Sequence, residues 1–184
     1  MTSLKEHLKQ KYGLSNYQIA QLAFVFKTVS SELSKMLIMG IIFHQHLKMY
    51  FFLLILMSCL RSFSGGIHFY TYWSCLASSV IYMWSNIAVL SNIAVPRYTQ
   101  IFLLLACIVI CYLISPVLSK YRVHFPEKQL YFCRNITCLI IFTYTLVLYI
   151  IPENAYFLAG FWMIILHSLQ LFVAKIKKKG VSIK

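Results

Sequence analysis

TQIFLLLACIVICYLISPVL, residues 99–118, is a long run without a charged side chain, and it is the best starting point for the fold. A transmembrane helix needs about 20 consecutive, mainly apolar residues to cross roughly 30 Å of hydrocarbon. We therefore expect a membrane-spanning helix here. The remaining sequence indicates whether this helix is a single anchor or one member of a bundle.

The composition indicates a bundle. Of the 184 residues, 60% are hydrophobic and 11% are charged, whereas a soluble domain is about 45–50% apolar and about 25% charged. Roughly 110 apolar residues, at about 20 per helix, fill about five or six spans and leave only short loops. We predict one all-α, polytopic membrane domain over residues 1–184, with about six transmembrane or re-entrant helices and no soluble catalytic domain.

The apolar segments differ in how well they suit a membrane crossing. Residues 49–60 are too few to cross alone at about 1.5 Å per residue, so this segment extends into its flanks, sits in thinned bilayer or is re-entrant. Before the first span, residues 1–13 carry lysines and have Leu4 and Leu8 four apart, which predicts a short interfacial helix. The other expected spans are residues 17–43, 72–95, 99–118, 136–151 and 155–174.

The charge balance indicates how the chain lies in the membrane. There are 17 Lys and Arg against four acidic residues, a net charge of +13. The basic residues cluster beside apolar runs, which the positive-inside rule and anionic lipid explain more simply than nucleic acid does. With six crossings the basic segments all lie on one side, which predicts a multi-pass membrane protein with both termini in the cytoplasm. These segments are the N-terminal helix, the Arg61 region, the loop over residues 119–135 and the tail over residues 175–184.

Several kinds of site are excluded or disfavoured. Aspartate is absent, which excludes paired-aspartate proteolysis and a literal Ser-His-Asp triad. The six cysteines lie mostly in or beside apolar segments and do not resemble a secreted disulfide framework. Cys107 and Cys111 share a helix face, but a dithiol without a second pair favours packing over a metal site, and His44 and His46 are interpreted as solvated loop residues. We expect neither a metal nor a cofactor.

The residues best suited to chemistry form the pattern Arg61-x3-Gly65-Gly66-x-His68-x6-Cys75. Paired glycines break a helix and let backbone approach backbone or substrate closely. Histidine transfers protons near neutral pH, and the thiolate of a cysteine is a nucleophile. Seven helical residues would place His68 and Cys75 about 10.5 Å apart along the axis, so a direct hydrogen bond of about 3 Å requires the chain to bend between them.

This pattern, placed between two spans, resembles the accessory gene regulator B type of membrane endopeptidase. The resemblance implies a protein of the bacterial cell membrane and cysteine-dependent processing of a short propeptide into a cyclic signalling peptide. Cys75 would attack a peptide carbonyl and form an acyl thioester, while His68 would take the thiol proton and later act as an acid. A nucleophile of the substrate would then close a thiolactone or lactone ring. The implied partner is a propeptide with an amphipathic leader and an acidic C-terminal segment, which complements a basic cytoplasmic face.

Other residues have supporting roles under this interpretation. Arg61 binds a substrate carboxylate or acidic side chain, or is a snorkelling lipid anchor. Backbone N–H groups around Gly65 and Gly66, or at the start of the next helix, are candidate oxyanion donors. Glu32 either forms a structural ion pair within its span or supports the active site. Lys120, together with Ser115 and Pro116, forms a second and weaker similarity to the family's sequence pattern.

Two other functional classes remain open at this point. A non-enzymatic transporter or exporter of a small peptide would use Lys27, Glu32 and Lys35, which lie within the first expected span. A structural or regulatory membrane protein would make no use of the motif. The resemblance is also compatible with a homodimer, although the sequence carries no decisive self-association motif.

Overall fold

The structure is a computed structural model, and it describes residues 13, 15–66, 71–117, 126–151 and 154–181, with side chains as far as residue 176. Within this part of the chain every regular element is helical, which confirms the predicted all-α class. The interfacial helix predicted over residues 1–13 lies outside the described residues, apart from Gly13. The helices are α2 (Asn16–Ile42), α3 (Leu47–Ser64), α4 (Tyr72–Trp84), α5 (Arg97–Ile114), α6 (Glu127–Ile150) and α7 (Ala155–Val181).

The chain divides into two units, residues 1–44 and residues 45–184, and α2 belongs to the first. Ser15 caps α2 through a capping box, in which its hydroxyl accepts from the Gln18 N–H and the Gln18 side chain accepts from the Ser15 N–H. Further along, Lys35 donates to Glu32 at 2.6 Å in an ion pair. The pair confirms that the two side chains share one helix face, as their spacing predicts.

Five helical stretches of the described residues are long and apolar enough to cross a membrane. Helix α2, which carries three charged residues, is not among them. The sixth crossing, and with it the cytoplasmic N-terminus, therefore stays a prediction. The five stretches are His44–Ser64, Tyr72–Asn92, Arg97–Ile114, Glu127–Ile150 and Ala155–Ile176.

The short apolar run over residues 49–60 becomes long enough once its flanks are included. Helix α3 begins at Leu47 and ends at Ser64, and together with the 3₁₀ turn His44–His46 it forms a stretch of 21 residues. At about 1.5 Å per residue, such a stretch covers about 30 Å. The helix therefore extends into its flanks, and by length and composition it can cross the membrane.

Three predicted boundaries in the second half of the chain differ from the structure. The span predicted over residues 99–118 ends early, because helix α5 finishes at Ile114. Helix α6 begins at Glu127 rather than at residue 136, so residues 127–135 are helical and do not belong to the predicted basic loop. Helix α7 likewise continues through most of the tail over residues 175–184. The predicted boundaries of α6 and α7 lie where the apolar run stops, but polar turns continue each helix beyond that run.

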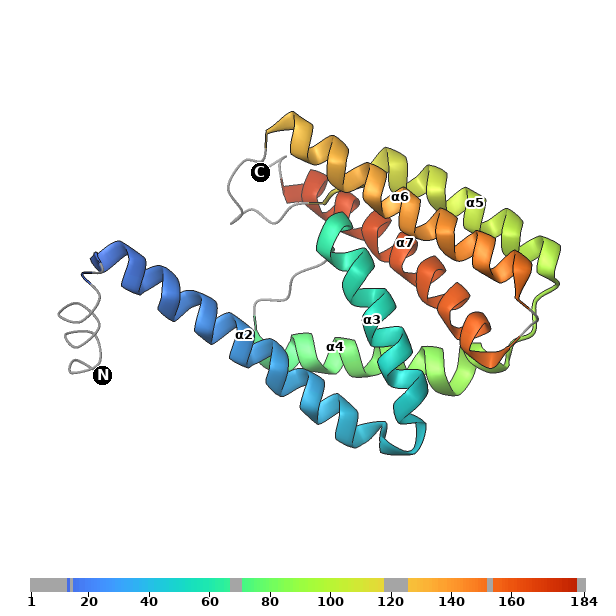
Figure 1. Cartoon of the computed structure of the whole chain (residues 1–184), viewed down its shortest axis with the longest axis horizontal. Helices are drawn as coiled ribbons and strands as arrows, with labels where there is room; N and C mark the ends of the chain where they lie inside the picture. Colours follow the sequence, from blue (N-terminus) through green and yellow to red (C-terminus); the bar gives the residue numbers. More distant parts are fainter. Residues whose placement is uncertain (1–12, 14, 67–70, 118–125, 152–153, 182–184) are drawn as a thin grey trace. The chain divides into compact units, whose positions relative to one another are not determined.

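Residues 45–184 form a helical bundle (Figure 1). Helix α5 packs against α6 and α7, and α3 packs against α7 and α6. Large apolar side chains such as Phe102, Leu139 and Phe172 are more than half exposed on the outside, as expected for contact with lipid. The centre of the core consists of fully buried side chains, namely Leu60, Leu104, Cys111, Ile141, Phe161, Ile164 and Leu171.

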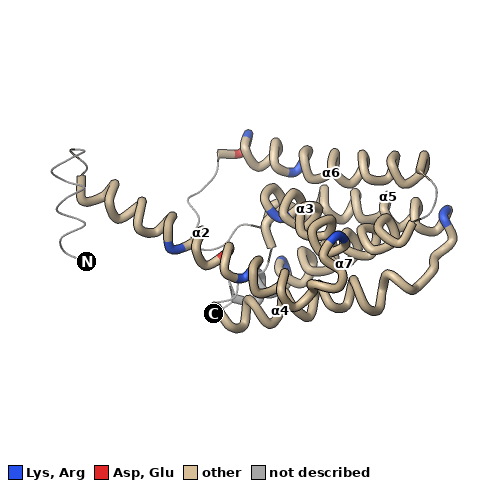
Figure 2. The backbone as a smooth tube through the Cα atoms, turned by 60° about the horizontal axis from the view of Figure 1, so that its bottom comes forward, with Lys and Arg blue, Asp and Glu red and all other residues tan. Residues whose placement is uncertain are grey.

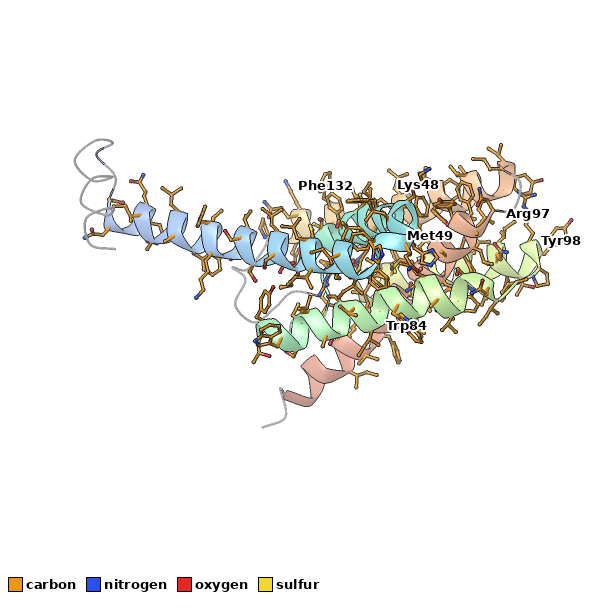
Figure 3. All side chains as sticks on the ribbon, turned by 90° about the horizontal axis from the view of Figure 1, so that it is seen from below. Lys48, Met49, Trp84, Arg97, Tyr98 and Phe132 are labelled. Atoms are coloured by element: carbon orange, nitrogen blue, oxygen red, sulfur yellow. The ribbon has the colours of Figure 1, made fainter. Side chains whose placement is uncertain are left out.

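The two ends of this bundle are joined by different contacts. At the first, which we call the Arg97 end, the Arg97 guanidinium donates to the carbonyl oxygens of Leu148 and Ile151 at 2.6 and 2.5 Å. Figure 3 shows Arg97 and Tyr98 at this end. At the other, which we call the motif end, α3 and α5 finish and α6 begins. Figure 2 shows that most Lys and Arg of α3 to α7 lie near helix ends, whereas α2 carries charged residues along its length.

Basic side chains hold the motif end together. Arg134 of α6 donates to the carbonyl oxygen of Ser115 at 3.1 Å, and Lys175 of α7 donates to that of Leu113 at 3.0 Å. Both satisfy carbonyls that have no partner at the end of a helix. The Arg61 region, the start of α6 and the C-terminal part of α7 thus share one end of the bundle, as the distribution of basic residues predicts. The side of the membrane on which this end lies stays a prediction.

Helix α4 is attached to the bundle through its C-terminal part. It continues into a π-helical turn, Ser85–Val89, and a 3₁₀ turn, Leu90–Asn92, and both pack against α7. The Tyr82 hydroxyl donates to the carbonyl oxygen of Met163 on α7 at 3.1 Å. The opposite end of α4 carries Cys75 in its first turn.

Candidate active site

Helix α3 ends at a turn that glycine adopts more readily than other residues. The N–H of Gly65 donates to the carbonyl oxygen of Arg61 at 3.1 Å, which is the last bond of the helix. Gly65 then has a φ of 77° and Gly66 a φ of 156°, conformations that a Cβ disfavours. The glycine pair therefore ends the helix, as the sequence predicts.

The close backbone approach expected at this turn is made to the segment that follows α5. The N–H of Val117 donates to the carbonyl oxygen of Ser64 at 2.9 Å, and Gly65 forms an isolated bridge with Val117. A Cβ on Gly65 would overlap the carbonyl oxygen of Val117. Glycine at this position thus permits two distant parts of the chain to meet.

Arg61 lies over the turn. It belongs to the last turn of α3, and its Nε is 3.5 Å from the position of a Cβ built on Gly66. Its role, as a group that binds the substrate or as a lipid anchor, stays a prediction.

Cys75 lies in the first turn of α4, as expected. Thr71 caps this helix: its hydroxyl accepts from the N–H of Ser74 at 3.3 Å, and its carbonyl oxygen accepts from the N–H of Cys75 at 3.2 Å. Cys75 is partly exposed and forms no disulfide. The N–H groups at a helix start carry partial positive charge and favour an anion beside them.

Three of the predicted site residues are not placed at the glycine turn or at the start of α4. His68 lies in residues 67–70 and Lys120 in residues 118–125, which are outside the described residues. Residues 67–70 connect the glycine turn to the cap of α4. Glu32 belongs to α2, where its ion-pair partner is in the same helix. The roles of all three residues stay predictions.

A buried hydrogen bond beside the turn was not predicted. Ser64 Oγ and His167 Nε2 are 2.7 Å apart, and the two residues are 0% and 1% exposed. The bond joins the last residue of α3 to the middle of α7. His167 could have been noticed in the sequence, because it lies within the apolar run WMIILHSLQLF, residues 162–172. Ionisable residues in membrane helices are costly and often functional. No spacing rule indicates the partner of His167.

Two of the other cysteines, Cys107 and Cys111, are packed in the interior of the bundle. Cys111 is buried, and its sulfur lies 3.5 Å from the Ser168 hydroxyl on α7; Cys107 is buried as well. Among the described residues, no three His, Cys, Asp or Glu side chains are grouped so that they could hold a metal. A cavity of about 310 Å³ lies at the Arg97 end, lined in part by Gln100 and Asn154, and is thus remote from the motif.

Comparison with known proteins identifies the family. The family model of accessory gene regulator B matches residues 2–172, nearly the whole chain, including all the predicted site residues. No curated protein and no solved structure matches the chain. The chain therefore belongs to the accessory gene regulator B family, membrane peptidases that process the AgrD propeptide in quorum sensing.

Proposed function

We propose that this protein cleaves its signalling propeptide through an acyl thioester on Cys75 and promotes cyclisation of the product. The placement of the motif carries the proposal. Arg61 lies at the end of α3, the glycine pair ends that helix, and Cys75 lies in the first turn of α4. The chain matches the family over nearly its full length. Basic residues gather at the motif end of the bundle, where Arg61 lies, which suits a propeptide with an acidic C-terminal segment.

The first step forms the thioester. His68 takes the thiol proton of Cys75, and the sulfur bonds to the carbonyl carbon of the scissile peptide bond. The C–N bond then breaks as His68 returns the proton to the leaving amine. The C-terminal segment departs, and the N-terminal part of the propeptide stays attached to Cys75.

The second step closes the ring. A cysteine thiol or serine hydroxyl of the attached peptide gives its proton to His68 and attacks the thioester carbonyl. The bond to Cys75 breaks, and the Cys75 sulfur recovers the proton from His68. Exchange between thioesters is nearly isoenergetic, so a thiolactone forms without ATP when water is kept away. A site among apolar helices favours this exclusion of water.

Backbone N–H groups at the start of α4 are the best candidates for stabilising the tetrahedral oxyanion. The N–H of Gly65 is bonded to the Arg61 carbonyl oxygen and serves to end α3. The N–H groups in the first turn of α4 lie at the positive end of the helix dipole. They also adjoin Cys75 in the chain, so we assign the oxyanion site to them.

Arg61 is proposed to bind an acidic side chain or the carboxylate of the departing segment. Its guanidinium can form paired hydrogen bonds with a carboxylate. Lys120, in the basic segment between α5 and α6, adds to the positive charge that attracts the propeptide. Such attraction between exposed charges weakens with salt, because the Debye length is only about 8 Å at physiological ionic strength.

Coexpression with the candidate propeptide, followed by mass spectrometry, tests this function. Cys75→Ala and His68→Ala should each abolish cleavage, because they remove the nucleophile and its base. Cys59→Ala is the matched control, since it removes an exposed cysteine from α3 and should process normally. Normal processing by both the Cys75→Ala and His68→Ala variants would refute the proposal.

A second experiment separates thioester formation from direct hydrolysis. A propeptide whose ring-forming residue is replaced by alanine can acylate Cys75 but cannot cyclise. We expect its N-terminal part to accumulate on the tryptic peptide that contains Cys75 and to be released by neutral hydroxylamine. Continued cleavage of this propeptide without any adduct would mean that water attacks the peptide bond directly.

The alternative, a non-enzymatic exporter of a small peptide, depends on the charged residues of α2. Glu32 and Lys35 are paired with each other there, which already explains their presence. The exporter predicts that Glu32→Gln abolishes transport and that Cys75→Ser leaves it intact. The peptidase predicts the reverse.

A further inference from the structure

We propose that His167 is a positioning residue for the processing reaction: through its hydrogen bond to Ser64, it holds the end of α3 and the glycine turn in the geometry that the reaction needs. The inference rests on the proposed function, because it gives a task in that reaction to a residue far from the motif. His167 acts through Ser64 and is not assigned any contact with the substrate.

The hydrogen bond has a defined direction. Ser64 Oγ is 2.7 Å from the carbonyl oxygen of Leu60 and 2.7 Å from His167 Nε2. A hydroxyl has one proton, and a carbonyl oxygen can only accept. Both bonds therefore form together only if Ser64 donates to Leu60 and His167 donates from Nε2 to Ser64.

The other ring nitrogen agrees with this assignment. Nδ1 of His167 is buried and has no hydrogen-bond partner among the described residues. With the proton on Nε2, the atom without a partner is an acceptor. The opposite tautomer would leave a buried N–H donor without a partner, which is rarer in proteins. The geometry points to a neutral histidine that serves as a donor to Ser64.

Ser64 connects three parts of the bundle. Its hydroxyl is bonded to α7 through His167, and its carbonyl oxygen accepts from the N–H of Val117 at 2.9 Å. The next residue, Gly65, lies so close to Val117 that a Cβ would not fit. The end of α3 is therefore attached to α7 on one side and to the segment after α5 on the other.

The groups proposed to meet the substrate depend on this attachment. Arg61 is in the same helical turn as Ser64, and the segment with His68 starts directly after Gly66. A misplacement of about 1 Å can lower an enzymatic rate roughly 100-fold. Loss of the bond should therefore reduce turnover more than substrate affinity.

Burial makes the bond hard to replace, and the neighbouring residue provides a control. Ser64 and His167 are 0% and 1% exposed, so water cannot readily replace a missing partner. Ser168 is also buried, on the same turn of α7, but its hydroxyl donates to the Ile164 carbonyl oxygen at 2.9 Å. Its described side-chain contacts are with α7 and α5, so it tests loss of a buried hydroxyl without loss of the bond to α3.

Kinetics of the full chain in proteoliposomes, with a synthetic propeptide, tests the proposal. His167→Ala should lower kcat about 10- to 100-fold, with a much smaller change in KM. His167→Gln should recover most of kcat, because its amide nitrogen can donate from close to the position of Nε2. His167→Asn places its amide near the position of Nδ1 and should behave like His167→Ala. Ser168→Ala should keep the wild-type kcat.

Amide hydrogen exchange at Val117 provides a readout that needs no propeptide. The Val117 N–H is bonded to the Ser64 carbonyl oxygen, so its exchange reports on the attachment. Exchange should accelerate in His167→Ala and His167→Asn and stay slow in His167→Gln and Ser168→Ala. Faster exchange together with a lower kcat in the same variants supports the proposal.

Three results would overturn it. The first is a wild-type kcat in His167→Asn. The second is a loss of kcat that His167→Gln does not relieve. The third is an additive loss in the Ser64→Ala/His167→Ala double variant, because two partners of one bond should give no further loss when both are removed. If the wild-type chain fails to process the propeptide, the proposed function is wrong, and exchange at Val117 alone decides whether His167 holds the turn.

Discussion

Replacing Gly65 with alanine perturbs the contact that joins the motif to the rest of the bundle. The new Cβ would overlap the carbonyl oxygen of Val117, and the φ of 77° is unfavourable for alanine. The left-handed conformation costs about 1–2 kcal/mol, and displacing Val117 from Ser64 loses a hydrogen bond of roughly 0.5–1.5 kcal/mol. Gly65→Ala should therefore lower the free energy of unfolding by about 1.5–3.5 kcal/mol.

Two measurements on the same preparation test this prediction. The free energy of unfolding is obtained by titrating mixed micelles with SDS, and kcat is measured in proteoliposomes under conditions in which the variant stays folded. We expect kcat to fall at least about tenfold, because the turn that leads from Arg61 to His68 is displaced.

Gly160→Ala is the matched control. A Cβ on Gly160 would overlap the hydroxyl of Tyr144, which donates to the carbonyl oxygen of Phe157 near the start of α7. This substitution should also destabilise the bundle, although the better helix propensity of alanine offsets about 1 kcal/mol. Its kcat should stay near the wild-type value. An equal loss of kcat in the two variants would refute the reasoning, as would an unchanged kcat in Gly65→Ala.

Three further substitutions have expected outcomes. Arg97→Ala should lower the free energy of unfolding by roughly 1–3 kcal/mol in SDS titration and leave processing unchanged, because it removes the donor to the Leu148 carbonyl oxygen at the far end from the motif. Tyr144→Phe should cost about 1 kcal/mol in the same titration, since its hydroxyl donates to Phe157 at 2.6 Å. Arg61→Gln should raise KM for a propeptide with an acidic tail and weaken the dependence of KM on salt, which kinetics at low and high ionic strength measure. An unchanged dependence of KM on salt would show that Arg61 does not bind the tail.

Local chemistry was enough to predict most of the helices and the end of α3. Apolar length predicts the spans, because lipid requires it whatever the neighbouring helices are. The pair Gly65–Gly66 predicts a break, because its φ values are accessible to glycine before any contact is made. The start of α6 at Glu127 was missed, since polar turns continue this helix beyond the stretch that hydropathy marks.

The pattern of charges predicts which helix ends lie together but not the number of membrane crossings. The clustering of basic residues predicted that Arg61, the start of α6 and the end of α7 lie together. Arg134 and Lys175, which both donate to carbonyl oxygens at the end of α5, place two of these segments there. The number of crossings does not follow from charge alone, because α2 carries an ion pair within a helix that is otherwise largely apolar.

Composition and the order of residues along the chain establish a helical membrane protein and predict Arg61, His68 and Cys75 as the groups for chemistry. They do so because hydropathy, glycine conformations and motif spacing act over short distances in the chain. The contacts of the glycine turn depend instead on the packing of α3 beside α5 and α7. Ser64 and His167 are 103 residues apart in sequence and 2.7 Å apart in space. Only the association of these helices brings the two side chains together, because no local preference links them.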